Sequence, residues 1–206
     1  MFVQVVRGLV GEPDPVFTRL DLWLDQLAPG AAGWLGTTAG ITRDGELVAF
    51  VRFASTAAAR ASSDRVEQGQ WWAESAVVFR GDVSFDNYED VTLVGDGGSD
   101  AAATVEVVLG RVHRRRRHDD LAAELGARSL EVAPDVIGGL VGLHDDGRLI
   151  QAVYFGSPPA HRCPDAAAAP AWQGTSAIVS DFRLLRLEDL WFGSPGAAVR
   201  RRSVAG

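Results

Sequence analysis

The strongest constraint on this chain is an internal repeat, because its second half matches its first half at a constant offset. The stretch FVQVVRGLV of residues 2–10 aligns with TVEVVLGRV of residues 104–112, so that Val105 stands over Val3. The same offset aligns GITRDGELVAFVRFAS of residues 40–55 with GLHDDGRLIQAVYFGS of residues 142–157. Separate segments share one register, and many mismatches exchange Ile, Leu and Val. We therefore infer two diverged copies of one structural unit.

The first copy reads as strand, helix, hairpin, helix and strand. Its expected strands cover residues 1–8, 34–42 and 46–53, and a last strand begins over residues 82–85, with a continuation through residues 91–94 as an option. Apolar residues at three- and four-residue spacing from Val16 to Leu27 predict an amphipathic helix, with Asp14 as N-cap and Pro15 at the first helical position. Asp44-Gly45 predicts a tight hairpin turn.

An Ala-rich second helix follows in the first copy. Ser55 is its expected N-cap, an interruption is expected near residues 62–64, and the helix resumes over residues 67–79. Trp71, Trp72 and Phe79 lie in this second part.

The second copy repeats this order. We expect strands over residues 104–112, 136–143, 148–155 and 182–192, a helix over residues 119–130, and a weak Ala-rich helix before the last strand. YEDVTLV of residues 88–94 also resembles LEDLWFG of residues 187–193 at a slightly shorter offset. The domain organisation is therefore a first repeat (1–94), a linker (95–103), a second repeat (104–193) and a flexible C-terminal tail (194–206).

The order βαββαβ is that of the ferredoxin-like unit, so the expected fold class is α+β. A four-stranded sheet with helices on one face leaves an apolar face that must be covered. The corresponding apolar face of the other repeat can cover this face, since both repeats belong to one chain. We therefore expect an intrachain pseudo-dimeric α+β barrel, with a homodimer as a further option.

The layout resembles the dimeric α+β barrels of the antibiotic biosynthesis monooxygenase-like superfamily, as a tandem-duplicated member. The matching stretches are Val51-Arg52-Phe53-Ala54-Ser55 and, less well, residues 153–157, each a strand that leads into the second helix. The resemblance implies a ligand pocket between the sheet and the second helix. It also implies one of several roles: cofactor-free oxidation of aromatic polyketides, haem degradation, cyclisation, or a role not yet assigned.

Composition excludes several kinds of chemistry. The chain contains no lysine, which excludes Schiff-base catalysis, pyridoxal phosphate anchoring and the P-loop lysine. Its net charge of −7 disfavours nonspecific nucleic-acid binding. A single cysteine, Cys163, permits no intramolecular disulfide and suits a cytoplasmic protein. No apolar run is long enough for a membrane span. The Arg, Ala, Gly and Val bias is typical of a GC-rich, for example actinobacterial, genome.

No metal or cofactor is expected from the histidines. His113, His118, His144 and His161 share no metal-ligand spacing. Many relatives of this kind carry a histidine on the second helix, and neither copy has one there, which counts against haem ligation. His161-Arg162-Cys163-Pro164 contains a Cys-Pro pair of the kind seen in haem-sensing segments, but the motif is short and a loop is the favoured interpretation. The run from Arg114 to Arg117 is either an anion site or a solvated loop.

Polar residues on apolar strands are the candidate site residues, because burying them unpaired is costly. Gln4 shares a strand face with Val6, Arg52 shares one with Phe50, and Thr38 lies on the adjacent strand. If these faces line a pocket, Arg52 is the candidate catalytic residue that stabilises a carboxylate or enolate, and Gln4, Thr38 and Phe50 contact the ligand. The alternative is that these polar groups face solvent or bond to a neighbouring strand.

Trp71, Trp72 and Phe79 are the aromatic candidates for ligand binding. Adjacent residues on a helix point about 100° apart, so one tryptophan is expected in the core and the other on a pocket wall. Stacking on an aromatic ligand and ordinary core packing are both consistent with this pattern.

Three functions remain open from the sequence. The first is a monooxygenase-like enzyme or binder that acts on an aromatic or polyketide-like molecule without a metal. The second is a non-catalytic ligand carrier or structural barrel, and the third is a haem-binding protein. The substrate, the oligomeric state and the role of Cys163 do not follow from the sequence.

Overall fold

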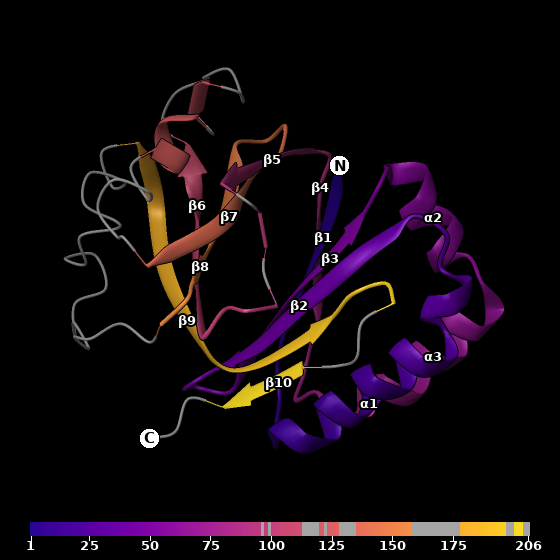
Figure 1. The fold of residues 1–206 in the computed structure, drawn as a ribbon. Coiled ribbons are helices and arrows are strands. Elements are labelled where there is room, and N and C mark those ends of the chain that lie inside the picture. The colour runs from indigo at the N-terminus through magenta and orange to yellow at the C-terminus, as the bar shows by residue number, and fades with distance from the viewer. Residues whose placement is uncertain are drawn as a thin grey trace. The chain divides into compact units, whose positions relative to one another are not determined.

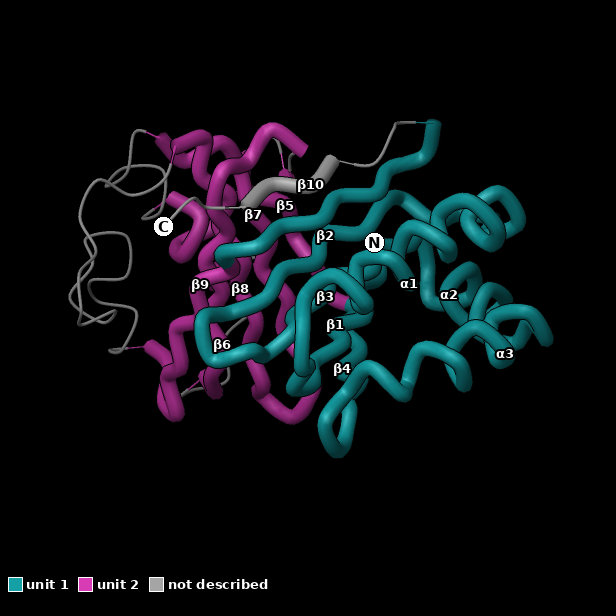
Figure 2. The backbone as a smooth tube through the Cα atoms, turned by 90° about the horizontal axis from the view of Figure 1, so that it is seen from below, with its two compact units in different colours: residues 1–89, 188–203 teal, residues 90–187, 204–206 magenta. Residues whose placement is uncertain are grey.

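The computed structural model describes residues 1–95, 97–98, 100–112, 120–121, 123–127, 135–157, 178–196 and 200–203. The chain forms two compact units, which are coloured separately in Figure 2. Unit 1 comprises Met1–Glu89 and Glu188–Ser203, and unit 2 comprises Asp90–Leu187. No helix in the described part of the chain is long and apolar enough to cross a membrane.

Unit 1 contains a complete ferredoxin-like repeat (Figure 1). Its strands are β1 (Phe2–Leu9), β2 (Trp34–Thr42), β3 (Glu46–Phe53) and β4 (Ser84–Tyr88). All pairings are antiparallel, in the order β4-β1-β3-β2. Gly45 takes a φ of 79° in the β2–β3 turn, a conformation that glycine adopts without steric cost. The predicted strands β2 and β3 are confirmed to the residue, and the ferredoxin-like order is confirmed.

The helices of unit 1 are α1 (Pro13–Gln26), α2 (Thr56–Ser63) and α3 (Val66–Ser75), with a short 3₁₀ turn, η1 (Ala28–Gly30), after α1 and another, η2 (Ala76–Val78), after α3. The predicted start of α1 was wrong, because Glu12 is the N-cap and Pro13 takes the first turn. Pro13 is already suited to that position, since it has no N–H to leave unpaired. Ser55 caps α2 as predicted, and its side chain accepts a hydrogen bond from the N–H of Ala58. The predicted break between α2 and α3 is confirmed.

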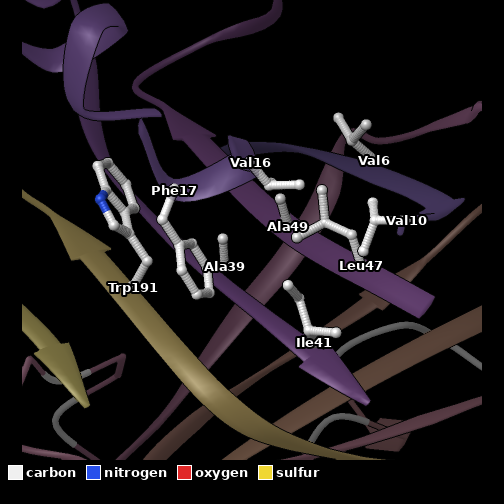
Figure 3. Close-up of a cluster of buried hydrophobic side chains, with 9 residues drawn as sticks. All are labelled: Val6, Val10, Val16, Phe17, Ala39, Ile41, Leu47, Ala49 and Trp191. Atoms are coloured by element: carbon white, nitrogen blue, oxygen red, sulfur yellow. The ribbon is translucent and has the colours of Figure 1, made fainter. Parts of the chain in front are cut away.

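One sheet face of unit 1 packs against these helices. Val6, Ala39, Leu47 and Ala49 from the strands meet Phe17 of α1 in a buried cluster (Figure 3). A second cluster joins strand and helix residues nearer the other end of the sheet: Phe2, Trp34, Phe53, Trp23, Leu27 and Ala59. The helix layer and the sheet thus share one apolar interior.

Unit 2 repeats the strand order of unit 1. Its strands are β6 (Thr104–Val112), β7 (Val136–Leu143), β8 (Arg148–Phe155) and the first part of β9 (Val179–Gly193), in the order β9-β6-β8-β7. Residues 120–121 and 123–127 are helical, within the predicted helix. The predicted Ala-rich helix before β9, the arginine run, Cys163 and all histidines except His144 lie outside the described residues.

The two units exchange the ends of their last strands. The final strand of the first repeat divides at Glu89, and its continuation β5 (Asp90–Gly95) pairs with β7 in unit 2. The final strand of the second repeat, β9, divides at Leu187, and its continuation belongs to unit 1. The structural units therefore differ from the simple division at residues 94 and 104. Arg200–Ser203 forms a strand, β10, that pairs with β9, where the sequence predicted a flexible tail.

Candidate functional site

A cavity of about 110 Å³ lies in unit 1 between the sheet and the helices. The helical lining comes from α1, from the end of α2 and from α3. The sheet lining comes from the helix-facing residues of β1, β2 and β3 and from Trp191 of β9. Ser63 and Phe85, which also line it, are exposed, so the cavity reaches the protein surface. An apolar cavity of about 150 Å³ holds one benzene ring, so this space suits part of an aromatic molecule or a single ring.

Aromatic side chains cluster in one part of the wall. Trp72 contacts three other rings, with centroid distances of 6.2 Å to Trp71, 5.9 Å to Phe79 and 4.9 Å to Phe85. The Trp72–Phe85 pair is edge-to-face, a favourable arrangement of two ring quadrupoles. Such a wall can stack on a planar ligand and also excludes water from it.

Two further tryptophans orient polar groups in the lining. The indole Nε1 of Trp23 donates to Oε1 of Gln68 at 2.7 Å. The indole Nε1 of Trp34 donates to Oγ1 of Thr37 at 3.0 Å. Trp23 and Trp34 contact one another edge-to-face with centroids 5.0 Å apart, so Gln68 and Thr37 are held by one aromatic pair.

Arg19 is the only ionisable residue among the described residues that line the cavity. Its Nε donates to Oγ of Ser75 at 3.0 Å, and its Nη2 lies 2.8 Å from Oε2 of Glu74. Nη2 also donates to the carbonyl oxygen of Trp71 at 3.3 Å. The guanidinium is thus tied to α3. No carboxylate, histidine, cysteine or tyrosine joins it in this lining, so the site offers no obvious proton acceptor.

The structure separates the predicted site residues into two groups. Gln4, Trp71, Trp72 and Phe79 line the cavity. Gln4 also donates from Nε2 to Oδ1 of Asn87 at 3.1 Å. Both adjacent tryptophans are half-buried and line the cavity, where the sequence had assigned only one to a pocket wall.

Arg52, Phe50 and Thr38 lie on the opposite face of the sheet, so the structure contradicts a pocket shared by Arg52 and Gln4. Gln4 is paired with Val51 and Arg52 with Val3, and side chains alternate between faces along each strand. The Nε of Arg52 instead lies 3.5 Å from the carbonyl oxygen of Gly36. Thr38 is paired with Phe50 across β2 and β3, on that same face.

Sequence reasoning missed Arg19, Gln68, Ser62, Thr37 and Trp191 as lining residues. Arg19 and Gln68 stand at polar positions of amphipathic helices, where a solvent-facing role is the ordinary reading. Trp191 lies at the far end of the chain, and only the strand exchange brings it into unit 1. The similarity between residues 88–94 and 187–193 is the one sequence signal that relates this segment to the first repeat.

Comparison with known proteins gives a fold and no family model. The sequence matches no protein-family model and no curated protein. Among solved structures, one described as a "putative monooxygenase" from Lactobacillus acidophilus NCFM has a TM-score of 0.65 at 10% identity, covering 97% of this chain and 98% of that chain. Another of the same description, from Fusobacterium nucleatum subsp. nucleatum ATCC 25586, has a TM-score of 0.68 at 11% identity, covering 98% and 97%.

A third similar structure is that of an anthrone oxidase-like protein, with a TM-score of 0.62 at 11% identity. The match covers 100% of this chain and 96% of that chain. The likeness therefore extends over the whole length of both polypeptides. It shows that this chain shares the fold of these monooxygenase-like proteins, as the sequence resemblance predicted.

Proposed function

We propose that this protein binds a small aromatic molecule in the unit 1 cavity and promotes its oxidation by dioxygen. The observation that carries the proposal is the wall formed by Trp71, Trp72, Phe79 and Phe85 around a space of about one ring. The shared fold with proteins described as monooxygenases and as anthrone oxidase-like supports the reaction class.

An anthrone-like molecule, with one ring in the cavity and the others toward its opening at Ser63 and Phe85, is a suitable substrate for a site whose described lining contains no carboxylate or histidine base. The methylene group of an anthrone lies between two aryl rings and opposite a ketone, so the substrate itself supplies an acidic C–H. Loss of that proton gives an electron-rich enolate, which can react directly with dioxygen. In the full reaction the CH₂ group becomes C=O, one O₂ is consumed, and the second oxygen atom leaves as water with the two hydrogens. The site would contribute orientation and a dry environment.

A non-catalytic carrier is the second candidate. The absence of a carboxylate or histidine in the described cavity lining favours it, because most proton-transfer catalysis uses such a group. A haem-binding role has less support, since the described lining residues include no His, Cys, Met or Tyr to ligate iron.

The test measures dioxygen uptake with anthrone in an oxygen electrode. We expect uptake above the uncatalysed rate, with one O₂ consumed per quinone formed, and a loss of that excess in Trp72→Ala. Val66→Ala is the matched control, because Val66 is 73% exposed on the same helix and does not line the cavity.

Saturable binding of anthrone without dioxygen uptake above the uncatalysed rate would favour the carrier function over the enzymatic function. Absence of both binding and uptake would overturn the proposal. A Soret band on haem titration would support the third function instead.

A further inference from the structure

Two polar side chains of the cavity, those of Gln68 and Thr37, each accept a hydrogen bond from a tryptophan indole. An indole N–H can only donate. The Gln68 atom that lies 2.7 Å from Nε1 of Trp23 must therefore be the carbonyl oxygen, which leaves the NH₂ group as the remaining polar end. By the same reasoning Oγ1 of Thr37 accepts from Trp34 at 3.0 Å, which leaves its hydroxyl hydrogen to be donated elsewhere.

These remaining donors have no acceptor within the described residues. Gln68 and Thr37 make no hydrogen bond there beyond those to the two tryptophans. Ser62, which also lines the cavity, is 5% exposed and has no hydrogen-bond partner in that part of the chain. Thr37 is only 4% exposed, so bulk water reaches its hydroxyl poorly. Neither Nε2 of Gln68 nor Oγ of Ser62 is among the completely buried, unpartnered side-chain atoms of the described residues, so solvent reaches both. A ligand acceptor in the cavity would replace that water and could also accept from the Thr37 hydroxyl.

The described lining residues offer no charged acceptor. The described lining residues contain no carboxylate, and Arg19 is already paired with Glu74 at 2.8 Å. A cationic ligand would find no counter-charge here. A ligand that carries an acceptor oxygen would find donors on Gln68 and Thr37, which the Trp23–Trp34 pair holds in place.

We propose that this cavity selects aromatic molecules bearing an acceptor oxygen, namely aryl ketones and phenolates, and that Gln68 is a specificity-determining residue. The inference rests on the proposed function, since it concerns the ligand of the same cavity. Donors that face a ligand oxygen bind it more strongly as negative charge develops on that oxygen. The arrangement therefore also suits an enolate formed from an aryl ketone.

The test compares two probes of the same shape. Acetophenone carries a C=O group where α-methylstyrene carries C=CH₂, so only the first offers an acceptor. Dissociation constants are measured from tryptophan fluorescence for the wild-type chain, for Gln68→Glu and for Gln70→Glu. Gln68→Glu retains an acceptor for Trp23 and removes both donor hydrogens. Gln70→Glu makes the same charge change at an exposed position on α3 that does not line the cavity.

We expect the wild-type chain and Gln70→Glu to bind acetophenone about five-fold more tightly than α-methylstyrene, as one neutral hydrogen bond allows. The preference should vanish in Gln68→Glu, with little change in the affinity for α-methylstyrene. Gln68→Met, which removes both polar ends, should lose the preference as well and provides the test if Gln68→Glu folds poorly.

The possible failures are distinguishable. If neither probe binds the wild-type chain, the aromatic cavity and this inference fall together. If both probes bind equally, or if the ketone preference survives in Gln68→Glu and Gln68→Met, the cavity binds aromatics but Gln68 does not select among them.

Discussion

The indole Nε1 of Trp191 donates a hydrogen bond of 2.7 Å to Oδ1 of Asp21. Trp191 lies in β9 and is completely buried, and Asp21 lies in α1. The bond therefore ties the first helix of the chain to a strand from its far end. Trp191 also belongs to the cluster beneath α1 and lines the cavity (Figure 3). Strand β9 thus contributes to the cavity lining as well as to the hydrophobic core.

Two substitutions of Trp191 should destabilise unit 1 by different amounts. Trp191→Phe removes the hydrogen bond and keeps a ring, so we expect a loss of about 1–2 kcal/mol in unfolding free energy. Trp191→Ala also empties the core position, with an expected loss of about 3–5 kcal/mol. Urea unfolding measures both values. As a control, Asp21→Asn keeps a carbonyl acceptor and should cost less than Asp21→Ala. A loss below about 1 kcal/mol for Trp191→Ala would contradict the placement of this residue.

Two glycines should differ in their tolerance of a methyl group. A Cβ at Gly139 would lie 2.5 Å from the carbonyl oxygen of Ala152, which is backbone and cannot move aside. A Cβ at Gly8 would lie 2.7 Å from Cδ1 of Phe79, which is a side chain that can rotate. We expect Gly139→Ala to cost about 1–3 kcal/mol and Gly8→Ala to cost less. Thermal unfolding compares the two. Equal losses would mean that Phe79 is held as firmly as the backbone.

The two partners of the Glu106–Arg186 ion pair in unit 2 should differ in the stability that is lost when each is replaced. Nη2 of Arg186 lies 2.6 Å from Oε1 of Glu106, whose side chain is 4% exposed against 29% for the arginine. Arg186→Met leaves a buried carboxylate without this partner, for an expected cost of about 3 kcal/mol. Glu106→Gln leaves an arginine that can reach solvent, so a smaller loss is expected. Chemical denaturation of both variants measures the difference, and a larger loss for Glu106→Gln would contradict the reasoning.

Asp146 should titrate far below an ordinary aspartate. The backbone N–H of Arg148, 3.0 Å from Oδ1, is the main cause that lowers its pKa to about 2 from 3.8, and the Arg148 side chain adds to it. Because the pKa of Asp146 is lower in the folded chain than in the unfolded chain, its ionised carboxylate stabilises the fold above about pH 4. That stabilisation is lost as the pH falls through about 2. Carboxyl-carbon NMR measures the titration. In Arg148→Gln the pKa should rise but stay below 3.8, because the backbone donor remains. An unchanged pKa in that variant would remove the guanidinium from the explanation.

The fold was predictable because its signals are local or repeated. Asp44-Gly45 and Asp146-Gly147 both form the predicted hairpin turns, with φ of 79° and 86° at the two glycines. Because the two copies share one alignment register, the strand order predicted for the first copy also applied to the second. The strand exchange was not predictable, because the choice between continuing along one sheet and crossing to the other depends on long-range packing.

The site was predictable only in part. Helical periodicity put only one of Trp71 and Trp72 on a pocket wall, whereas both line the cavity, and the position of Arg52 relative to Gln4 depends on how β1 and β3 are paired. A shift of one residue in that pairing reverses which side chains share a face. The observed pairing of Gln4 with Val51 puts the cavity on the helix side of the sheet and Arg52 on the other. Gln68 and Thr37 gain their significance only from contacts with Trp23 and Trp34 that the sequence does not reveal.

The most direct test of the unit 1 cavity is an NMR titration of the wild-type chain with acetophenone. We expect saturable shifts of the indole N–H signals of Trp23, Trp71 and Trp72, with the methyl signals of Leu149 in unit 2 unchanged. Shifts confined to unit 2, or no saturable shift at any indole up to the solubility limit of the ketone, would contradict the assignment of this cavity as the ligand site.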